Sequence, residues 1–337
     1  MKQKFCNAML GVFLLAVIFT GCSLFGIDDS GNSATSTSDG VTTATGDASA
    51  SDQNDVEQAL LGDDFFNQAM SDMLDEDESM MESSSMTTGL QFFSSNLTDT
   101  TLPIAEFHQR WRRHRTGLAS INKSFEFGRN GDTNYRNVSI TRNITGLLLV
   151  DTSRDAIKNP GNKSFTDTIS HKWYFEKFPG RKWHVVKMSP REIKLADASK
   201  QKVYIDKIEV QKSGQIVFSV TSPDQMFIKA DLPRFNRGDR VKVMATVRNI
   251  SPNYNPDCLV FLHHFNVWGK IARVRLFDDG THGDLYANDN VFTNTFYIHG
   301  PLIQHVVIDV LDSKCLQNQT EDDYNSNAWG LPYRVIN

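Results

Sequence analysis

Short runs in which apolar and polar side chains alternate dominate the chain after Ser124, and this period of two constrains the fold more than any other feature. Such runs occur at residues 135–140, 144–151, 165–178 and 183–188, and Pro179-Gly180 supplies a turn between the last two. Alternation places successive side chains on opposite faces of a strand, so one face can be buried while the other meets solvent. The pattern predicts a meander of antiparallel strands and a mainly β protein.

A second set of short strands is expected from Lys202 onward. These runs lie at residues 203–205, 208–210, 216–220, 241–247, 259–265, 271–277, 291–297 and 306–311. The turn residues between them and their spacing suit a β-sandwich. In size and strand spacing this part resembles an immunoglobulin-like or fibronectin type III-like module, which implies a sandwich domain over residues 202–337.

One clear helix is expected before the meander. Pro103 suits a first helical turn, Glu106 favours a helix start, and apolar residues recur at helical spacing at Ile104, Phe107, Trp111, Leu118 and Ile121. A helix followed by curved antiparallel strands resembles the cystatin-like or NTF2-like α+β roll, here over residues 102–195. The expected fold class is mainly β with α+β: an antiparallel α+β roll at 101–198 followed by the immunoglobulin-like β-sandwich.

The other face of this expected helix carries four arginines, Arg110, Arg112, Arg113 and Arg115. Arginine forks match phosphate geometry, so the cluster could bind the phosphates of lipopolysaccharide or anionic lipid. It could equally be a solvated face or a counterpart to acidic residues elsewhere in the chain. Nucleic acid is not an expected partner.

The N-terminus indicates export. A short basic start precedes an apolar run at residues 8–19, which is shorter than the roughly 20 residues of a membrane-spanning helix. The tetrapeptide Phe19-Thr20-Gly21-Cys22 closes the run and resembles the lipobox of bacterial lipoproteins. This resemblance implies a signal peptide at 1–21, a lipid on Cys22 and, with Ser23 following, delivery to the outer membrane. An ordinary signal peptide or an uncleaved anchor is the alternative.

Charge divides the mature chain into an acidic arm and a basic body. No lysine or arginine occurs between Lys4 and Arg110, although aspartate and glutamate recur throughout that stretch. Residues 22–54 are rich in Ser, Thr, Gly and Asp and poor in large apolar groups, so they are expected to form a disordered acidic tether. Helical spacing from Asp55 to Leu74 predicts a short helix, followed by a loop up to residue 100.

Cysteine usage fits export. Cys6 would leave with the signal and Cys22 would take the lipid, so Cys258 and Cys315 remain. In an oxidising compartment they could form one disulfide, and two separately buried thiols are equally open.

The stretch RLFDDGTHGDLYANDNVFT at residues 275–293 lies between two expected strands. It resembles the DDGxxGDxxAxDGxYT loop of immunoglobulin-like modules in extracellular bacterial proteins and chloride-channel accessory proteins, with Asn290 where glycine is usual. Short Asp and Asn side chains can cap their own turns, or their oxygens can converge on calcium. The candidate calcium ligands are Asp278, Asp279, Asp284, Asn288 and Asp289.

An enzyme must also be weighed. His171 would share one face of a long strand with Asp167, Ile169, Trp173 and Phe175, where it could act as a general base or be a hydrogen-bonded core histidine. The adjacent His263 and His264 would point to opposite faces of their strand. The sequence carries no nucleophile elbow, zinc-protease, Walker or dinucleotide motif.

Together these features predict a non-enzymatic, lipid-anchored lipoprotein of the cell envelope, with no catalytic residues, that serves as a binding or structural module. Its expected contacts are the membrane through Cys22, an envelope protein or polysaccharide partner, and calcium as the one candidate cofactor. The alternative is an envelope enzyme or small-ligand carrier that uses a pocket in the α+β roll.

Overall fold

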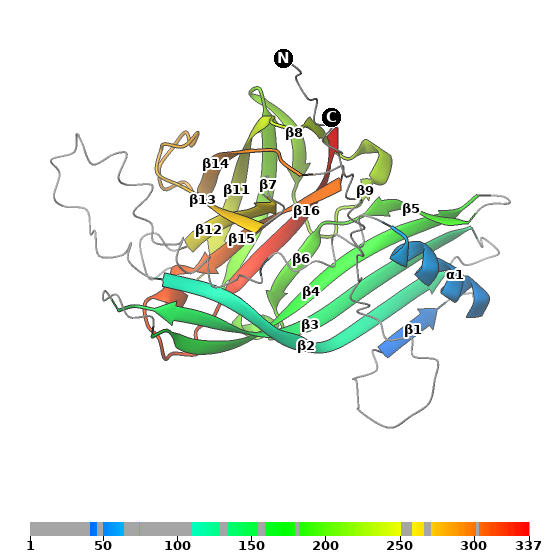
Figure 1. The fold of residues 1–337 in the computed structure, drawn as a ribbon, viewed down its shortest axis with the longest axis horizontal. Coiled ribbons are helices and arrows are strands. Elements are labelled where there is room, and N and C mark those ends of the chain that lie inside the picture. The colour runs from blue at the N-terminus through cyan, green and yellow to red at the C-terminus, as the bar shows by residue number, and fades with distance from the viewer. Residues whose placement is uncertain are drawn as a thin grey trace, which may run out of the picture. The chain divides into compact units, whose positions relative to one another are not determined.

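Antiparallel β-structure makes up most of the fold, as the alternating sequence pattern predicts (Figure 1). The computed structural model describes residues 41–45, 50–63, 74, 110–127, 134–153, 159–178, 182–250, 258–265, 271–300 and 303–336. The signal peptide at 1–21 and the lipid attachment site Cys22 lie outside the described residues.

The larger of two sheets has twelve strands. Its main order is β1 (Val41–Thr45), β2 (Arg110–Phe127), β3 (Tyr135–Asp151), β4 (Gly161–Lys177), β6 (Arg191–Leu195), β16 (Ser326–Ile336), β15 (Ile303–Asp312), β12 (Cys258–Phe265) and β13 (Ile271–Leu276). Three short strands lie off this order. β5 (Trp183–Met188) pairs with β4 and with β9 (Phe227–Ile228), and β10 (Arg234–Asn236) pairs with β16. Only the β1–β2 and β10–β16 pairs of this sheet are parallel.

The smaller sheet has four strands in the order β14 (Val291–Tyr297), β11 (Arg240–Asn249), β7 (Val203–Lys212) and β8 (Gln215–Val220). It packs against β16, β15 and β12 of the larger sheet through one apolar cluster, whose members include Val210, Val243, Phe296, Val310 and Leu331. Burial of this apolar surface stabilises the pairing of the two sheets. A β-sandwich therefore occupies the region where the sequence predicts one.

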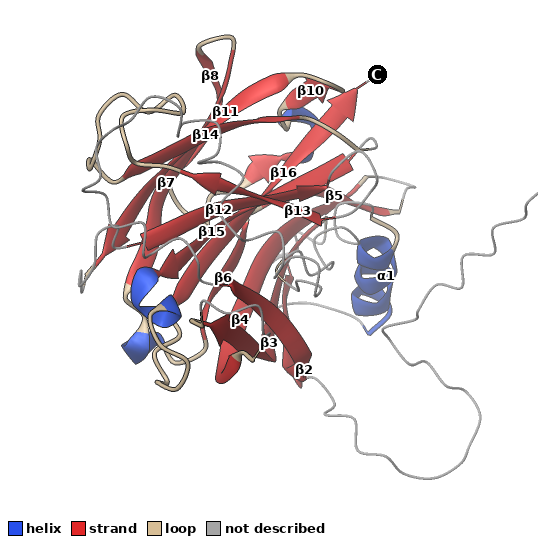
Figure 2. Cartoon of the chain, turned by 60° about the vertical axis from the view of Figure 1, so that its left-hand side comes forward, coloured by secondary structure: helices blue, strands red, loops and turns tan. Residues whose placement is uncertain are grey.

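The inner face of β2–β4 is covered in two ways. At one end α1 (Ala50–Leu61) lies beside the sheet (Figure 2). Its Val56 and Leu60 are buried against the aromatic side chains of Phe125, Trp173 and Trp183. Farther along, the same face packs on side chains from β12, β15 and β16.

Four ion pairs also hold α1 and the residues after it on the body. Asp52 lies 3.7 Å from both Arg136 and Lys177, and Glu57 lies 3.8 Å from Lys123. The carboxylate of Asp63, just past the helix, pairs with Lys229. The acidic arm thus meets basic side chains of the body, as its charge leads one to expect.

The helix expected at 103–121 is wrong over its described part, because residues 110–127 form strand β2. Two irregularities, between Arg115 and Gly117 and between Leu118 and Ser120, each insert one extra residue into the strand. They place Arg115, Leu118 and Ile121 three residues apart on one face. Because Arg113 and Arg115 occupy the positions between, the apolar residues Trp111, Leu118 and Ile121 fall seven and three residues apart, which imitates helical spacing. The resemblance to the cystatin-like or NTF2-like roll depended mainly on this helix, so its main support is gone.

Two expected boundaries also differ from the structure. The division between 101–198 and 202–337 falls inside one sheet, because β6 pairs directly with β16. The described residues from Val41 to Ile336 accordingly belong to one compact unit. The expected disordered tether at 22–54 contains strand β1 and the start of α1, and the helix expected at 55–74 runs instead from Ala50 to Leu61.

Candidate functional site

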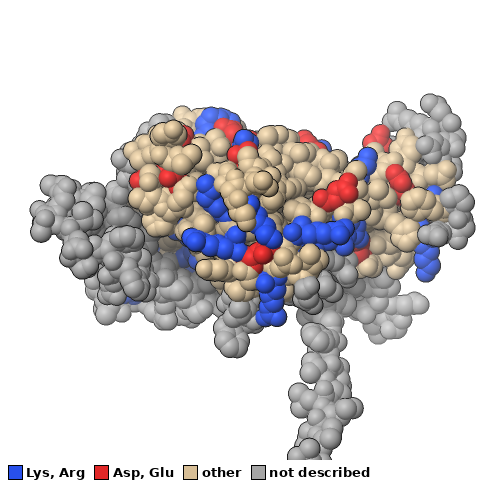
Figure 3. All heavy atoms as spheres, turned by 90° about the horizontal axis from the view of Figure 1, so that it is seen from above, with Lys and Arg blue, Asp and Glu red and all other residues tan. Residues whose placement is uncertain are grey.

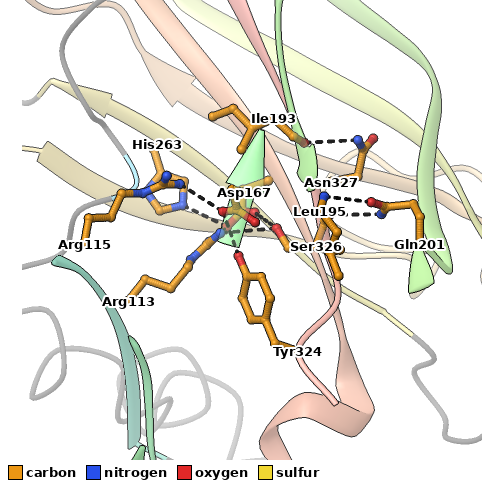
Figure 4. Close-up of polar contacts among 11 residues, drawn as sticks. Arg113, Arg115, Asp167, Ile193, Leu195, Gln201, His263, Tyr324, Ser326 and Asn327 are labelled. Carbon is orange, nitrogen blue, oxygen red and sulfur yellow. Dashed lines mark hydrogen bonds and ion pairs between the residues drawn. The ribbon is translucent and has the colours of Figure 1, made fainter. Parts of the chain in front are cut away.

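A buried ion pair joins β2 to β15 (Figure 4). The Arg113 guanidinium donates to Asp309 Oδ2, and both side chains are fully buried. His263 Nε2 lies 3.3 Å from the same carboxylate oxygen, and the Ser326 hydroxyl donates to Asp309 Oδ1 over 3.3 Å. Burial would raise the pKa of Asp309, but Arg113 and His263 outweigh burial and hold that pKa well below its usual range.

A second pair joins β2 to β4 beside the first. Arg115 Nη2 donates to Asp167 Oδ2 over 3.2 Å, and the Tyr324 hydroxyl donates to the same oxygen over 3.1 Å. Burial raises the pKa of Asp167 to about 6, against the lowering effect of Arg115. The residues Arg113, Arg115, Asp167, His263, Asp309, Tyr324 and Ser326 are called the polar latch below.

The polar latch can fasten the sheet, but its geometry does not suit catalysis. It connects residues as much as 213 positions apart in the sequence and links β2 to β15 and β16. Buried charges are tolerated when they are paired, and each of the two arginines of the polar latch is paired with a buried carboxylate. Since Asp167 and Asp309 are both fully buried, neither carboxylate is open to a substrate.

His171 lies on the inner face of β4 with Asp167, Ile169, Trp173 and Phe175, as alternation predicts. Its Nε2 is 2.7 Å from the Ser189 carbonyl oxygen, and its ring packs on Trp173 with 4.1 Å between ring centroids. Burial, together with nearby Arg191, lowers the pKa of His171 to about 3. His171 is therefore a neutral, hydrogen-bonded core histidine at neutral pH.

The structure splits the four arginines proposed as an anionic-surface site. Arg113 and Arg115 belong to the polar latch, so their expected exposure to phosphate is wrong. Arg110 and Arg112 are half-buried on β2. On the face seen in Figure 3, basic side chains form several patches with acidic side chains among them rather than one continuous surface.

The acidic loop at 278–290 is built by its own side chains. Asp278 accepts hydrogen bonds from the backbone N–H groups of Asp289 over 3.1 Å and Asn290 over 2.8 Å, and Asp284 accepts from the N–H of Gly280 over 2.8 Å. Positive φ angles of 62° at Asn288 and 66° at Asn290 fit the tolerance of asparagine for left-handed backbone. Asp278 and Asp284 therefore form the turn by capping its backbone amides, one of the two roles expected for these side chains.

Three of the five candidate calcium ligands come together. One oxygen from each of Asp278, Asp284 and Asp289 lies within 4.8 Å of the other two. Asp279 instead caps Thr281, accepting from its N–H over 2.8 Å and its hydroxyl over 2.6 Å, and Asn288 contributes to the loop through its left-handed backbone. Burial is the main cause that raises the pKa of Asp278, and the nearby charges of Asp289 and Asp284 raise it further. Together they outweigh the two backbone hydrogen bonds, which lower it.

Of the two alternatives for Cys258 and Cys315, the structure has the separately buried free thiols and not the disulfide. Cys258 packs in the sandwich cluster with Val260, whereas Cys315 packs with Leu316 in a different cluster. Burial raises the pKa of the Cys315 thiol far above its ordinary value.

A small cavity lies between the two sheets of the sandwich. Its volume is about 10 Å³, and its lining is apolar, with Phe218, Phe235, Phe296 and Tyr333 among the residues around it. That volume is about the minimum for one water molecule, so the cavity is a packing defect rather than a substrate site.

Sequence reasoning missed three members of the polar latch, Asp309, Ser326 and Tyr324. One signal was present: Asp309 interrupts the apolar run Val306-Val307-Ile308 and Val310-Leu311. A carboxylate in the middle of such a strand can be buried only with a cationic or hydrogen-bonding partner.

In the described part of the chain, no helix is both long enough and apolar enough to cross a bilayer. No protein-family model, curated protein or solved structure matches the chain.

Proposed function

We propose that this chain is a lipid-anchored, non-enzymatic lipoprotein of the cell envelope, held in the outer membrane through Cys22, and that it binds or supports an envelope component. The Phe19-Thr20-Gly21-Cys22 sequence and the apolar run before it support the anchor. The chain between Cys22 and β1 would link the lipid to the folded body.

The observation that carries the non-enzymatic part is the enclosure of the polar latch. The latch brings together two carboxylates and a histidine, yet Asp167, Asp309 and His263 are buried and bonded to partners from other strands. A catalytic acid or base has to come within hydrogen-bond reach of its substrate, directly or through one water. Because these groups are buried and hold strands together, they favour a structural role for the interior. Binding would then fall to the exterior.

The acidic loop supports the same proposal. Its hydrogen bonds hold a fixed backbone that presents Leu285 and Tyr286, which are 79% and 70% exposed. A rigid loop with a protruding aromatic residue loses little conformational entropy when it contacts a partner. Calcium binding by Asp278, Asp284 and Asp289 remains a proposal, supported by the convergence of their carboxylates.

Lipid attachment tests the proposal directly. The full chain and a Cys22→Ser variant are expressed in a Gram-negative host fed an alkyne fatty acid, and the label is read on a gel after membrane fractionation. We expect label and membrane association in the parent and loss of both in Cys22→Ser. An unlabelled parent chain, or equal labelling of the two chains, would rule out the anchor.

A further inference from the structure

The outer face of β2–β4, opposite the polar latch, carries an uncharged array of short polar side chains. Strand register aligns them in two neighbouring rows of three, one residue from each strand. The six residues are Asn122, Thr141 and Ser170 in one row and Ser120, Asn143 and Thr168 in the next. We call this set the hydroxyl-amide face.

The composition of this face is unusual for the solvent side of a sheet. Charged residues make up 22% of the chain, yet none occurs among these six positions. Nearby charges lie at its border: Lys172 follows in the next row, and Lys194 and Glu192 on β6 pair with each other at 2.8 Å. Asparagine is depleted in strands, so its use at two mid-strand positions favours a role beyond strand formation.

Part of the face is already held in place by its own hydrogen bonds. Asn143 donates to the Ser120 hydroxyl over 3.0 Å and accepts from the Thr168 hydroxyl over 2.6 Å. A hydroxyl has one donor and two acceptor sites, so Ser120 keeps its donor and Thr168 keeps acceptor capacity. The bonds fix the side chains while leaving groups that can bind a ligand.

An aromatic pair lies on the same face toward the start of β3. Tyr135 and Tyr174 stack with ring centroids 5.9 Å apart and planes at 18°. Tyr174 is four residues beyond Ser170 along β4, about 13 Å at the usual rise of a strand. Lys172 lies in the row between Ser170 and Tyr174 and pairs with Asp224 at 2.6 Å, and the Lys187 ammonium lies 5.1 Å from the centroid of the Tyr174 ring. The two rings add an apolar platform at this end of the face.

We propose that the hydroxyl-amide face and the tyrosine pair bind a neutral polysaccharide. Phosphate-bearing or sulfated polymers need cationic side chains, which the six positions lack. A protein hot spot needs large anchors such as Trp, Arg or Tyr at its centre, whereas the centre here is Ser, Thr and Asn. An uncharged polymer rich in hydroxyl groups matches the hydrogen-bonding capacity of the six positions and the absence of charge among them. This inference rests on the proposed binding function and names the class of its ligand.

Affinity electrophoresis of the full chain tests the proposal. Native gels contain hydroxyethyl cellulose, xylan, glucomannan or dextran, with dextran sulfate as the charged comparison. The test variant is Asn122→Ala/Ser170→Ala, which leaves the bonds of Asn143 intact. The matched control, Ser219→Ala/Thr246→Ala, removes polar groups of similar size from half-buried positions in the smaller sheet. Equal urea midpoints for all three chains establish that each is folded.

We expect retardation of the parent in at least one neutral gel, at least a tenfold higher dissociation constant for the test variant, and no change for the control. Absence of retardation in every neutral gel, or equal retardation of the test variant, would overturn the proposal. Retardation confined to dextran sulfate and lost in 0.5 M salt would also overturn it and would indicate an anionic ligand. The gel assay needs no membrane, so failure of lipid attachment at Cys22 would be seen separately.

Discussion

Removal of Asp309 from the polar latch is expected to be strongly destabilising. Asp309→Ala leaves the Arg113 guanidinium fully buried without its carboxylate, and loss of one partner of a buried pair costs about 3–5 kcal/mol. For a domain of this size that loss lowers the melting temperature by roughly 6–10 °C. The free energy of unfolding is measured by urea titration at pH 7 with tryptophan fluorescence. Trp111 reports on the site because the Arg113 guanidinium lies 5.9 Å from its ring.

Two comparisons make this prediction specific. Arg113→Met/Asp309→Leu removes both charges and fills the space with apolar groups, so it should recover most of the stability lost in Asp309→Ala. Asp206→Ala breaks an exposed pair with Arg248, in which the Asp206 side chain is 42% and the Arg248 side chain 51% exposed. It should change stability by less than about 1 kcal/mol. The latch explanation is refuted if Asp309→Ala costs no more than Asp206→Ala, or if the double variant is no more stable than Asp309→Ala.

Three further predictions concern pH, the acidic loop and the arm. Burial keeps the pKa of His171 at about 3 in the folded chain, below 6.5 in the unfolded chain, so the parent loses stability as pH falls below 6.5. In urea titrations His171→Gln should reduce this loss between pH 7 and pH 4.5 by about 3 kcal/mol. An unchanged pH dependence would contradict the burial argument. Asp284→Ala removes the acceptor for Gly280 N–H and should cost about 1–2 kcal/mol in EDTA as well as in calcium, whereas a loss seen only with calcium would make the loop a metal site. Val56→Asp places a charge in the fully buried contact of α1 with the sheet and should release α1, seen as a red shift in tryptophan emission as Trp183 meets water; an unshifted spectrum would show that α1 does not shield it.

Alternation predicted much of the β-structure because burial on one face leaves a direct pattern in the sequence. The inner face of β4, from Asp167 through His171 to Phe175, was predicted residue by residue. The strand at 110–127 was not, because two bulges disturb the alternation and two of its inner positions are arginines. Arg113 and Arg115 were assigned to solvent since their carboxylate partners lie far away in sequence.

The candidate sites were likewise predictable only where their contacts are local in sequence. The acidic loop was predictable because its contacts are local: Asp284 bonds to Gly280, four residues away. Only the structure shows that its carboxylates converge and that Asp279 turns to Thr281 instead. The rows of the hydroxyl-amide face depend on the register of three strands, which no local pattern specifies.

Co-sedimentation with cell-envelope fragments tests most directly whether the exterior binds and the interior serves the fold. A Cys22→Ser chain, which has no lipid to carry it into membranes, is compared with and without the Arg113→Met/Asp309→Leu replacement, and the fraction pelleted is measured against fragment concentration. The account predicts that both chains pellet at the same fragment concentration. If the replacement leaves the chain folded and yet in the supernatant, the polar latch is itself the functional site and the account is contradicted.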